Sequence, residues 1–480
     1  MTASRRLVLV SNRLPTTLET GPDGPALKPS SGGLVTAMRP VFQTRQGYWV
    51  GWLGEGRQED MERLLEPRAR EGCQLVPVSL TPTERKGFYT GFSNEIVWPL
   101  FHDLQSRCNF DPSYWNAYTG VNRKFAEAAA RVSSAESLIW VHDYHLMMVG
   151  ECLRGMGVQA KMGFFLHIPF PALDIFEKLP WRSEILRALF QYDVIGLQTH
   201  RDQRNFLGCV RRLLPEIDLE RRDDEVRARL DGRVTVIRSF PIGIDFDEFA
   251  RHAKQPDVTR RAEEIYRDLG GRRIVLGVDR LDYTKGVPER LKAFQHFLAT
   301  WRNLRRKISL VQVVVPSRES IPEYRELKRE TERLISQING QYGDPGWMPV
   351  HYIHRRVERA ELVALYRAAD TALVTPLKDG MNLVAKEFCA AQEGEQGALI
   401  LSEFAGAAEQ LREGSILVNP YDVYGVADAL HAAYRMPRAE RMERMKKLRR
   451  KVRHANVFRW CEDFCSYLER ADAGDLRAVS

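Results

Sequence analysis

Short apolar runs recur along the whole chain, and they restrict its fold more than any other feature. Each run is three to eight residues long, and most are followed by polar or charged residues. Parallel strands that are buried on both faces have this near-continuous apolar pattern. Helix-compatible segments between the runs, such as 114–132 and 184–191, predict an α/β fold with a doubly wound sheet. In the first half the expected strands are Leu7–Val10, Tyr48–Trp52, Gln74–Val78, Leu138–Val141, Met162–Leu166, Val194–Leu197 and Val234–Ile237.

The same pattern restarts after a turn-rich, charged segment that follows Asp245. A chain of 480 residues is longer than one hydrophobic core usually supports. We therefore expect two Rossmann-like domains, residues 1–245 and 246–455, and then a helical segment, residues 456–480. Ligands of such sheets bind outside the carboxyl ends of the strands, so the two domains should face a deep interdomain cleft. The expected strands of the second domain are Ile274–Val278, Ile308–Val315, Val350–Ile353, Ala372–Thr375, Ala398–Leu401 and Ile416–Val418.

The composition disfavours several classes of protein. The chain carries 71 basic and 63 acidic residues, a net charge of +8. Neither a zinc-finger spacing nor an RNA-recognition motif accompanies this charge, so nucleic acid is not an expected partner. The seven cysteines are scattered and include no Cys-x-x-Cys pair, which indicates reduced thiols in a cytoplasmic protein. No apolar run reaches the roughly 18 residues of a membrane helix, and no signal-peptide core follows the start, so no membrane association is expected.

The stretch Thr375–Glu387 combines a strand end, a tight turn and a helix start. Positions 376–380 have turn composition, and the residues from Asn382 onward favour a helix. A helix start carries unpaired N–H groups and a partial positive charge that suit a phosphate. Carboxylates at Asp379 and Glu387 would flank this start, which suits a sugar nucleotide with hydroxyls at both ends. An ordinary βα turn with solvated acids is the alternative.

Polar groups follow the ends of six expected strands, and one cleft would gather them. They are Asn12 and Arg13, His142–His145, His167–Pro171, Arg280–Gly286, Ser317 and Arg318, and Asp379 and Gly380. The histidines lack the spacing of a zinc motif, and no cluster of Cys or Glu accompanies them, so no bound metal is expected. Without a metal, Arg280 and Lys285 are the natural groups to neutralise a leaving pyrophosphate, unless they are ordinary surface residues in salt bridges. The P-loop, nucleophile-elbow and dinucleotide fingerprints are missing, which disfavours kinases, serine hydrolases and dehydrogenases.

The segment Thr16–Ser31 is rich in Gly, Pro, Thr and Ser, and we expect it to be a long loop. It leads into Gly32 and Gly33, whose lack of side chains would let backbone N–H groups approach a phosphate closely. A flexible turn is the alternative interpretation of this glycine pair.

Longer motifs then occur in a characteristic order. They are Phe88–Tyr89, Gly91–Asn94, Trp98–His102, Trp140–His145, Phe164–Pro171, Asp279–Gly286, Thr375–Glu387 and Val418–Asp422. Together they closely resemble the trehalose-6-phosphate synthases, over nearly the whole chain. The resemblance implies a GT-B fold and a retaining transfer of glucose from a nucleotide sugar, usually UDP-glucose, to glucose-6-phosphate, without a metal or other cofactor. It also implies that the first domain binds the acceptor, that the second binds the donor, and that the last helix crosses back to the first domain. From its pattern alone, that helix could equally pack within the second domain.

The resemblance implies roles for individual residues. The acceptor residues are Arg13, Trp49, Tyr89, Trp98, Asp143 and Arg318. Among these, the guanidiniums, the phenol and the indole N–H of Trp49 would hold the phosphate. The donor residues are Gly33, His167, Arg280, Lys285, Asp379, Asn382, Leu383, Val384 and Glu387, of which His167, Arg280, Lys285 and Asp379 are the expected catalytic residues. Front-face attack, in which the leaving phosphate oxygen takes the acceptor's proton, needs no enzymic nucleophile, so these groups would position the substrates and stabilise charge.

Several alternatives stay open. Val357 stands where the family often has an aromatic residue against the base, so UDP-, ADP- and GDP-glucose are all candidate donors. The related glucosylglycerol-phosphate synthases use glycerol-3-phosphate, whereas Tyr89, Trp98 and Asp143 favour a hexose phosphate. A catalytically silent sensor of sugar phosphates is the alternative from another class of function. We also expect a homo-oligomer and a separate phosphatase that removes the phosphate of the product.

Overall fold

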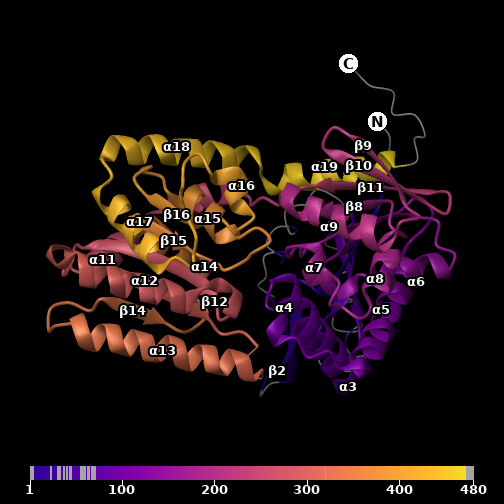
Figure 1. Cartoon of the computed structure of the whole chain (residues 1–480), viewed down its shortest axis with the longest axis horizontal. Helices are drawn as coiled ribbons and strands as arrows, with labels where there is room; N and C mark the ends of the chain where they lie inside the picture. The colour runs from indigo at the N-terminus through magenta and orange to yellow at the C-terminus, as the bar shows by residue number, and fades with distance from the viewer. Residues whose placement is uncertain are drawn as a thin grey trace. The chain divides into compact units, whose positions relative to one another are not determined.

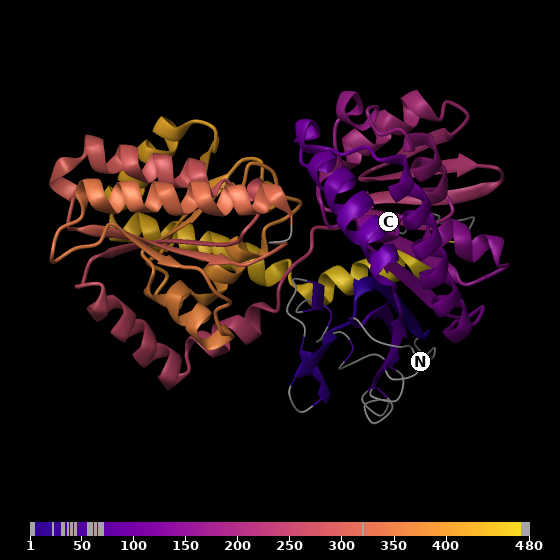
Figure 2. The ribbon, with the colours of Figure 1, turned by 90° about the horizontal axis from the view of Figure 1, so that it is seen from below.

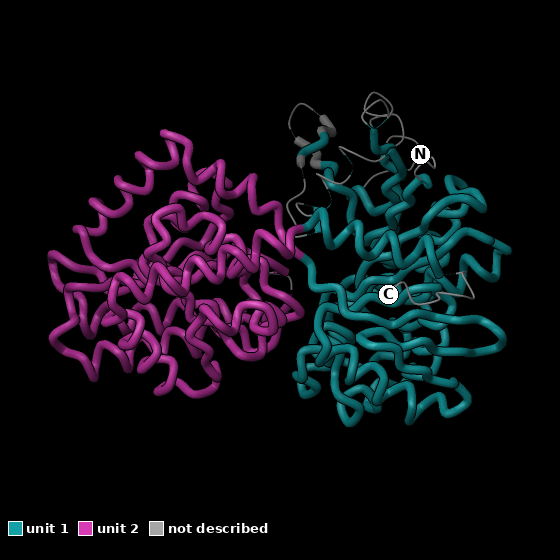
Figure 3. Tube along the Cα trace, turned by 90° about the horizontal axis from the view of Figure 1, so that it is seen from above, with its two compact units in different colours: residues 1–242, 457–480 teal, residues 243–456 magenta. Residues whose placement is uncertain are grey.

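The computed structural model describes residues 5–21, 24–29, 46–54, 72–318 and 321–471, together with the single positions 34, 35, 38, 42, 61 and 65. The chain forms two compact units, shown in teal and magenta in Figure 3. Unit 1 comprises residues 1–242 and 457–480, and unit 2 comprises residues 243–456. Each unit is organised around one large, mostly parallel sheet (Figure 1).

Unit 1 is built on a nine-stranded sheet with the order β5-β4-β1-β6-β7-β8-β11-β10-β9. Seven strands run parallel, and β10 and β9 extend one edge through antiparallel pairs. The strands are β1 (Leu7–Arg13), β4 (Gly47–Trp52), β5 (Cys73–Val78), β6 (Leu138–His142), β7 (Lys161–Phe165), β8 (Val194–Leu197), β9 (Asp218–Arg222), β10 (Glu225–Leu230) and β11 (Arg233–Ser239). All strands predicted for this half are confirmed, with ends that agree to within three residues.

Helical segments connect these strands. They are α3 (Pro82–Arg85), η2 (Lys86–Val97), α4 (Trp98–Phe101), η3 (Gln105–Arg107), α5 (Pro112–Val132), η4 (Tyr144–Leu146), α6 (Val149–Gly155), α7 (Leu173–Phe176), α8 (Arg182–Leu189) and α9 (His200–Leu213). The longest, α5, starts where Asp111 caps it by accepting the N–H of Ser113 at 2.9 Å. Its buried face repeats every three or four residues and packs against β1, β4 and β5.

Three features of unit 1 were not predicted. The segment expected to be a long loop contains a hairpin of β2 (Thr16–Gly21) and β3 (Gly24–Pro29). The charged strands β9 and β10 were not predicted, because neither is a continuous apolar run. The helical segment η2 is π-helical over twelve residues, and its buried side chains include Phe88 and Phe92. A π-helix is rare and often lies at a functional site.

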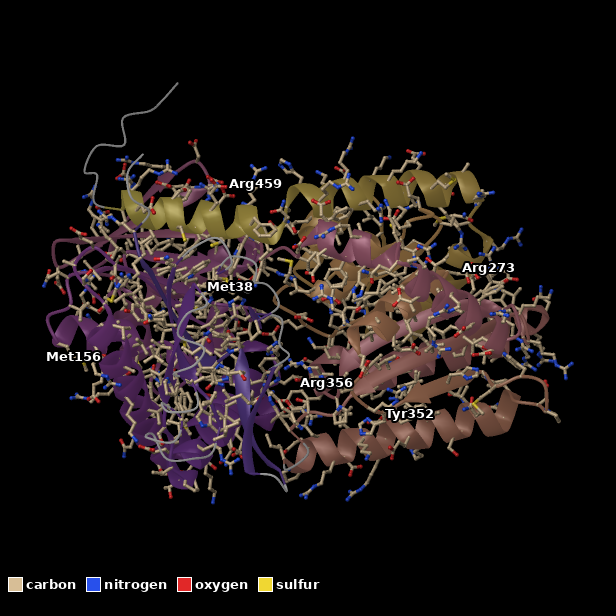
Figure 4. The ribbon with its side chains drawn as sticks, turned by 180° about the vertical axis from the view of Figure 1, so that it is seen from behind. Met38, Met156, Arg273, Tyr352, Arg356 and Arg459 are labelled. Carbon is tan, nitrogen blue, oxygen red and sulfur yellow. The ribbon has the colours of Figure 1, made fainter. Side chains whose placement is uncertain are left out.

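The last helix, α19 (Val457–Arg470), belongs to unit 1 and packs against β6, β7 and β8 (Figure 1). Its buried face includes Trp460, Phe464 and Leu468, which are four residues apart. The ring of Phe464 stacks on Trp140 of β6 with a centroid distance of 4.3 Å. Arg459, which is labelled in Figure 4, is half exposed on the outer side of the same helix. The helix α19 is therefore part of unit 1, where it covers strands of the nine-stranded sheet.

Unit 2 contains a six-stranded, all-parallel sheet with the order β14-β13-β12-β15-β16-β17. Helices lie on both sides of it (Figure 2). The strands are β12 (Arg273–Arg280), β13 (Ile308–Val315), β14 (Val350–Ile353), β15 (Thr371–Val374), β16 (Ala398–Ser402) and β17 (Ile416–Val418). The helices are α10 (Phe246–Ala253), α11 (Pro256–Asp268), η5 (Tyr283–Lys285), α12 (Val287–Thr300), η6 (Arg302–Leu304), α13 (Pro322–Tyr342), α14 (Arg359–Ala368), α15 (Leu383–Ala391), α16 (Ala407–Leu411), α17 (Val423–Arg435) and α18 (Arg438–His454).

Both sheets have the strand order of a Rossmann fold. Numbered along the chain, the parallel strands of unit 2 lie in the order 3-2-1-4-5-6, and those of unit 1 begin with the same order. The order therefore reverses between β1 and β6 in unit 1 and between β12 and β15 in unit 2. None of the helices in the described ranges is long and apolar enough to span a membrane.

Candidate active site

In unit 1 two of the expected acceptor residues lie at the ends of the two strands between which the strand order reverses. Arg13 is the last residue of β1, and Asp143 directly follows β6. His167, an expected donor residue, lies two residues beyond β7, the next strand along. Ligands of open α/β sheets bind outside the strand ends at such a point. The topology thus assembles these three side chains at the carboxyl edge of one sheet.

The guanidinium of Arg13 lies over aromatic rings. Its central carbon is 4.7 Å from the ring centre of Trp52 and 5.5 Å from that of Tyr89. The two rings are 6.4 Å apart. These distances are in the range of cation–π contacts, so the rings orient the guanidinium while its N–H groups stay available for an anion.

Trp49 does not belong to this cluster. Its side chain is only 2% exposed, and its indole N–H donates to the hydroxyl oxygen of Ser11 at 2.7 Å. The donor that was expected to bind a phosphate is therefore already used inside the fold. Successive side chains of a strand point to opposite faces, so Trp52, three residues later, points away from the face of Trp49. We therefore replace Trp49 by Trp52 in the candidate site.

Tyr89 and Trp98 are connected by a chain of aromatic rings. Tyr89 stacks on His145 with ring centres 5.8 Å apart and planes 9° from parallel. His145 in turn packs on Tyr144 at 3.9 Å, and Tyr144 packs on Trp98 at 5.7 Å. Tyr144 also donates from its hydroxyl to the side-chain carbonyl of Asn94, 3.0 Å away. The loop after β6 thus holds the two expected acceptor aromatics through His145 and Tyr144. The sequence placed these two residues at a strand end but gave them no individual role.

Asp143 and His167 are joined directly. The backbone N–H of His167 donates to Oδ1 of Asp143 at 3.2 Å, and the N–H of Asp143 donates to the carbonyl of Phe165 at 2.7 Å. Asp143 has a φ of 76°, in the left-handed region that non-glycine residues rarely adopt. Such a conformation persists only where the surroundings enforce it, and it is common at functional sites.

The ring of His167 meets a second histidine. Nε2 of His167 lies 3.0 Å from Nδ1 of His142, the last residue of β6. Burial lowers the pKa of His167 to about 3. Burial, and then the neighbouring His167, also hold the pKa of His142 well below its usual value. Both rings are therefore neutral at physiological pH, and one donates a hydrogen bond to the other.

In unit 2 the expected donor residues follow β12 and β15, the strands between which the order reverses. Nζ of Lys285 donates to Oδ2 of Asp379 at 2.5 Å, and the amide of Asn382 donates to the same oxygen at 3.1 Å. Lys285 and Asp379 are mostly buried, with side chains 11% and 15% exposed. The structure therefore brings three of the expected donor residues into one hydrogen-bonded group.

Two close backbone approaches fix this group. A Cβ atom at Gly286 would lie 2.4 Å from the carbonyl oxygen of Thr375, and the φ of Gly286 is +64°. A Cβ atom at Gly406 would lie only 1.8 Å from the carbonyl oxygen of Gly380. Only glycine fits at either position, so the loop after β12 and the loop after β15 are held at defined distances from their neighbours.

The start of α15 provides backbone donors beside Asp379. Asn382 caps the helix by accepting the N–H of Ala385 at 3.2 Å, and Leu383 and Val384 form its first turn. The first N–H groups of a helix have no intrahelical partner, which makes this end an anion site. Glu387 lies on the same helix and accepts a hydrogen bond from the hydroxyl of the buried Tyr366 at 2.8 Å. Burial raises the pKa of Glu387, and the bond from Tyr366 opposes that rise.

A buried carboxylate, Asp282, lies among the cations of this unit. Its side chain is fully buried, and the guanidinium of Arg318 lies 3.6 Å from it. Burial would raise the pKa of Asp282, but the charges of Arg318, Arg280 and Lys285 lower it below its ordinary value. Asp282 also fixes the loop after β12 by accepting the N–H and the hydroxyl of Thr284. It therefore holds together cations that the sequence assigned to different substrates.

Among the residues expected at the site, Gly33 lies outside the described residues. Trp52, Asp282, Tyr366 and His142 are residues that the sequence analysis did not assign. Asp282 and His142 lie within motifs that were identified, whereas nothing in the sequence indicated Tyr366 as a partner of Glu387. Across the described ranges, no group of three or more His, Cys, Asp and Glu side chains is arranged to hold a metal ion.

Comparison with known proteins gives one consistent result. The model of glycosyltransferase family 20 matches residues 5–470. A trehalose-6-phosphate synthase of Mycobacterium avium is 44% identical over 475 residues, which cover 98% of this chain and 96% of the relative. A trehalose-6-phosphate synthase of Mycobacterium tuberculosis is 43% identical over 474 residues and covers 97% of this chain and 94% of the relative.

Solved structures agree with this result. A UDP-forming α,α-trehalose-phosphate synthase from Burkholderia xenovorans, in complex with glucose-6-phosphate, has a TM-score of 0.88 at 34% identity. The alignment covers 97% of this chain and 100% of that one. An E. coli protein bound to UDP-2-fluoro glucose has a TM-score of 0.87 at 33% identity, with coverages of 97% and 99%. The predicted fold class, two Rossmann-like doubly wound domains of the GT-B type, is confirmed. By its sequence and its fold, the chain belongs to glycosyltransferase family 20.

Proposed function

We propose that this protein is a trehalose-6-phosphate synthase, which transfers glucose from UDP-glucose to glucose-6-phosphate and releases UDP. The observation that carries the proposal is the group formed by Lys285, Asp379 and Asn382 at the start of α15. It combines a cation, a carboxylate and free helix-start N–H groups at the reversal point of a Rossmann sheet, as a sugar diphosphate requires. Relatives with 44% identity and nearly full coverage carry the same activity in their names.

For the donor, we assign the diphosphate to Arg280, Lys285 and the N–H groups of the first turn of α15. We assign a hydroxyl of the donor glucose to the carboxylate of Asp379, whose Oδ2 accepts hydrogen bonds from Lys285 and Asn382. Glu387, oriented by Tyr366, is placed to accept from the ribose hydroxyls. His167 is the unit 1 residue that we assign to the donor glucose.

For the acceptor, we assign the phosphate of glucose-6-phosphate to Arg13, Tyr89 and Arg318. Arginine suits this role because its fork of N–H groups matches phosphate oxygens. The guanidinium of Arg13 is oriented by Trp52 and Tyr89, and that of Arg318 by Asp282 and Tyr324. Trp98 and Asp143 then contact the sugar ring, one as an apolar wall and one as a hydrogen-bond acceptor.

The reaction proceeds without an enzymic nucleophile. The anomeric hydroxyl of the acceptor attacks C1 of the donor glucose from the face that the diphosphate leaves, so the donor configuration is retained. The bond from C1 to the phosphate oxygen breaks as the new C1–O bond forms, and that phosphate oxygen takes the acceptor's proton. Asp379 is engaged by Lys285 and Asn382, which suits a positioning role rather than covalent attack. Arg280 and Lys285 stabilise the charge that develops on the diphosphate.

The proposal includes a cellular setting. We expect the enzyme to act in the cytoplasm, since each of its seven cysteines is a thiol. We expect it to form a homo-oligomer, to need no cofactor beyond its two substrates, and to depend on a separate phosphatase to remove the product phosphate.

The test is a matrix of donors and acceptors with the purified protein. UDP-, ADP- and GDP-glucose are each combined with glucose-6-phosphate and with glycerol-3-phosphate, and nucleotide release is followed over time. We expect turnover with glucose-6-phosphate, fastest with UDP-glucose, and a product in which NMR shows two α-linked anomeric carbons. The variant Asp379→Asn controls for contaminating enzymes.

Each other outcome selects another function. Turnover with glycerol-3-phosphate alone would make the protein a glucosylglycerol-phosphate synthase. Binding of glucose-6-phosphate without turnover of any donor would make it a sensor. The donor that reacts fastest shows which base the enzyme prefers. A preference for ADP- or GDP-glucose would mean that the base preference differs in a protein with Val357 in place of the usual aromatic residue.

A further inference from the structure

His142 is a fully buried polar residue beside the candidate site. Its ring is 0% exposed, and it ends β6 directly before Asp143. The ring makes one hydrogen bond, between its Nδ1 and Nε2 of His167 at 3.0 Å. Its other nitrogen, Nε2, is buried and has no hydrogen-bond partner in the part of the chain that the structure describes. A buried histidine with one satisfied nitrogen calls for an explanation.

The surroundings of the pair are almost entirely aromatic. The ring of His142 lies 4.5 Å from Trp140 and 6.2 Å from Trp460 of α19, measured between ring centres. The ring of His167 lies 4.7 Å from Phe165 and 6.1 Å from Trp460. The bond between the two histidines therefore lies against aromatic rings on several sides. Burial lowers the pKa of each ring, so the pair is held neutral.

A neutral pair has two possible hydrogen arrangements. If Nε2 of His167 donates, His142 carries its own proton on Nε2, and a buried N–H group is left without a partner. If Nδ1 of His142 donates, the orphan atom is a bare ring nitrogen, which loses less than an orphan N–H donor. The second arrangement is therefore preferred. It places the proton of His167 on Nδ1, an atom with no hydrogen-bond partner among the described residues.

Adjacent residues thus hold His167 at two points. His142 binds the ring, and Asp143 accepts the backbone N–H at 3.2 Å. The left-handed backbone at Asp143, with a φ of 76°, lets consecutive side chains reach the same target. Fixing both the main chain and the ring leaves His167 little freedom, as preorganised sites require.

We propose that His142 is a positioning residue that donates from Nδ1 to His167 and so fixes His167 as the Nδ1–H tautomer, a hydrogen-bond donor to a hydroxyl oxygen of the donor glucose. This inference rests on the proposed function, because it needs His167 to contact the donor sugar. His142 itself touches no substrate. The tautomer makes His167 a donor and prevents it from acting as a base at Nδ1.

The first test determines the tautomers in the wild-type protein. In protein labelled with ¹⁵N-histidine, long-range ¹H–¹⁵N spectra report which ring nitrogen carries the proton, and His167→Gln assigns the signals. We expect His167 to be protonated on Nδ1 and His142 on Nδ1 in the free protein. Protonation of His167 on Nε2 would overturn the inference, whether or not the protein transfers glucose.

The second test uses two substitutions and a control. His142→Phe keeps the ring but removes the hydrogen bond, and we expect kcat/KM for UDP-glucose to fall roughly 10- to 100-fold with the KM for glucose-6-phosphate unchanged. His142→Asn places an amide donor near the lost Nδ1 and should recover most of that loss. Trp140→Phe disturbs the same aromatic wall without touching the bond, and it should stay within about threefold of wild type.

The outcomes separate the inference from the function on which it rests. If wild-type protein transfers glucose but His142→Phe is as active as Trp140→Phe, the inference is wrong and the function stands. If wild-type protein transfers no glucose from any donor, the proposed function is wrong, while the spectra still decide the tautomer. If His142→Phe fails to fold, His142→Asn and the wild-type spectra carry the test.

Discussion

The positive charge at the carboxyl end of β12 comes from Arg280 and Lys285, and it supports the first prediction. Arg280→Ala should lower kcat by roughly 100-fold or more, because it removes charge stabilisation at the leaving diphosphate. The effect should appear in single-turnover rates as well, since the chemical step is affected. Arg329→Ala, an exposed arginine of α13 that pairs with Glu326, is the matched control and should leave kcat unchanged. Normal activity of Arg280→Ala would remove Arg280 from the site.

Trp49 and Trp52 allow a second prediction, because only one of them supports Arg13. Trp52→Leu removes a ring 4.7 Å from the guanidinium, and a cation–π contact of about 0.5–2 kcal/mol corresponds to a roughly 2- to 30-fold rise in the KM for glucose-6-phosphate. Trp49→Phe instead leaves Ser11 without its buried donor and should lower the free energy of unfolding by about 1–3 kcal/mol with the KM unchanged. The opposite pattern, with KM rising for Trp49→Phe alone, would restore Trp49 to the site.

The two buried histidines predict how stability depends on pH. Their pKa values are lowered by burial, so below the ordinary histidine pKa of about 6.5 the unfolded chain binds protons that the folded protein does not. Stability from each group is therefore complete above about pH 6.5 and falls as the pH falls toward the folded pKa, which for His167 is about 3.

Between pH 7 and pH 5 each such histidine should cost about 2 kcal/mol of unfolding free energy. His142→Phe should therefore lose less stability over this interval than wild type, by about that amount, when urea unfolding is measured at both values. Trp140→Phe does not titrate and should follow the wild-type dependence. A steeper loss for His142→Phe than for wild type would contradict the neutral state of the pair.

Motifs in the sequence identified most of these residues but not their partners. Arg13, Asp143, Lys285 and Asp379 were identified at expected strand ends and given roles by the family resemblance, and in the structure they lie near the ends of the strands at the two reversal points. Trp49 and Trp52 lie on the same predicted strand, and a strand pattern that is apolar throughout does not tell which face is buried. His142 and His167 are 25 residues apart, so their hydrogen bond depends on the neighbouring positions of β6 and β7.

The packing of α19 against the first sheet depends on glycines. A Cβ atom at Gly163 of β7 would lie 2.6 Å from the ring of Phe464, and one at Gly196 of β8 would lie 2.8 Å from the same ring. The ring thus sits directly on the backbone of two strands. Helix and sheet approach this closely only because these positions lack side chains.

Gly163→Ala should therefore destabilise the protein by about 1–3 kcal/mol, the usual cost of overpacking a core. Gly120→Ala is the matched control, because Gly120 is an exposed position inside α5 with no atom within 4 Å of its added Cβ. That change should stabilise the protein by up to about 1 kcal/mol, from helix propensity. Chemical denaturation of both variants measures the difference. Equal stabilities would mean that α19 does not depend on this contact.

The strands that were predicted are stabilised by burial of apolar side chains. The elements that were missed depend more on backbone hydrogen bonds. Central strands such as β1 and β13 are buried on both faces and show it as apolar runs. The hairpin of β2 and β3 has no such run, and its pairing is set by hydrogen bonds between segments rich in Gly, Pro and Thr. The π-helical geometry of η2 likewise has no signal in the apolar pattern, because its hydrogen bonds lie five residues apart rather than four.

In the molecule as a whole, the same strand order is used twice, and each sheet contributes one set of candidate residues. The βα alternation predicted both sheets, since it depends only on local patterns. It does not specify which sheet a terminal helix joins. The face of Trp460, Phe464 and Leu468 could cover either one. It packs against β6, β7 and β8, where Gly163 of β7 and Gly196 of β8 leave room for the ring of Phe464.

The two sets predict that the two substrates protect different peptides from hydrogen exchange. UDP alone should slow exchange in peptides that cover Asp279–Gly286 and Pro376–Glu387, because the diphosphate occupies backbone N–H groups at the start of α15. Glucose-6-phosphate alone should protect peptides that cover Lys86–Trp98 and His142–His145 in unit 1, and the peptide that contains Arg318. Uridine is the control for UDP, since it lacks the diphosphate and should not protect the start of α15. If UDP protects the unit 1 peptides and leaves Pro376–Glu387 unchanged, the nucleotide does not bind at the reversal point of the second sheet, and the division of substrates between the two sheets is wrong.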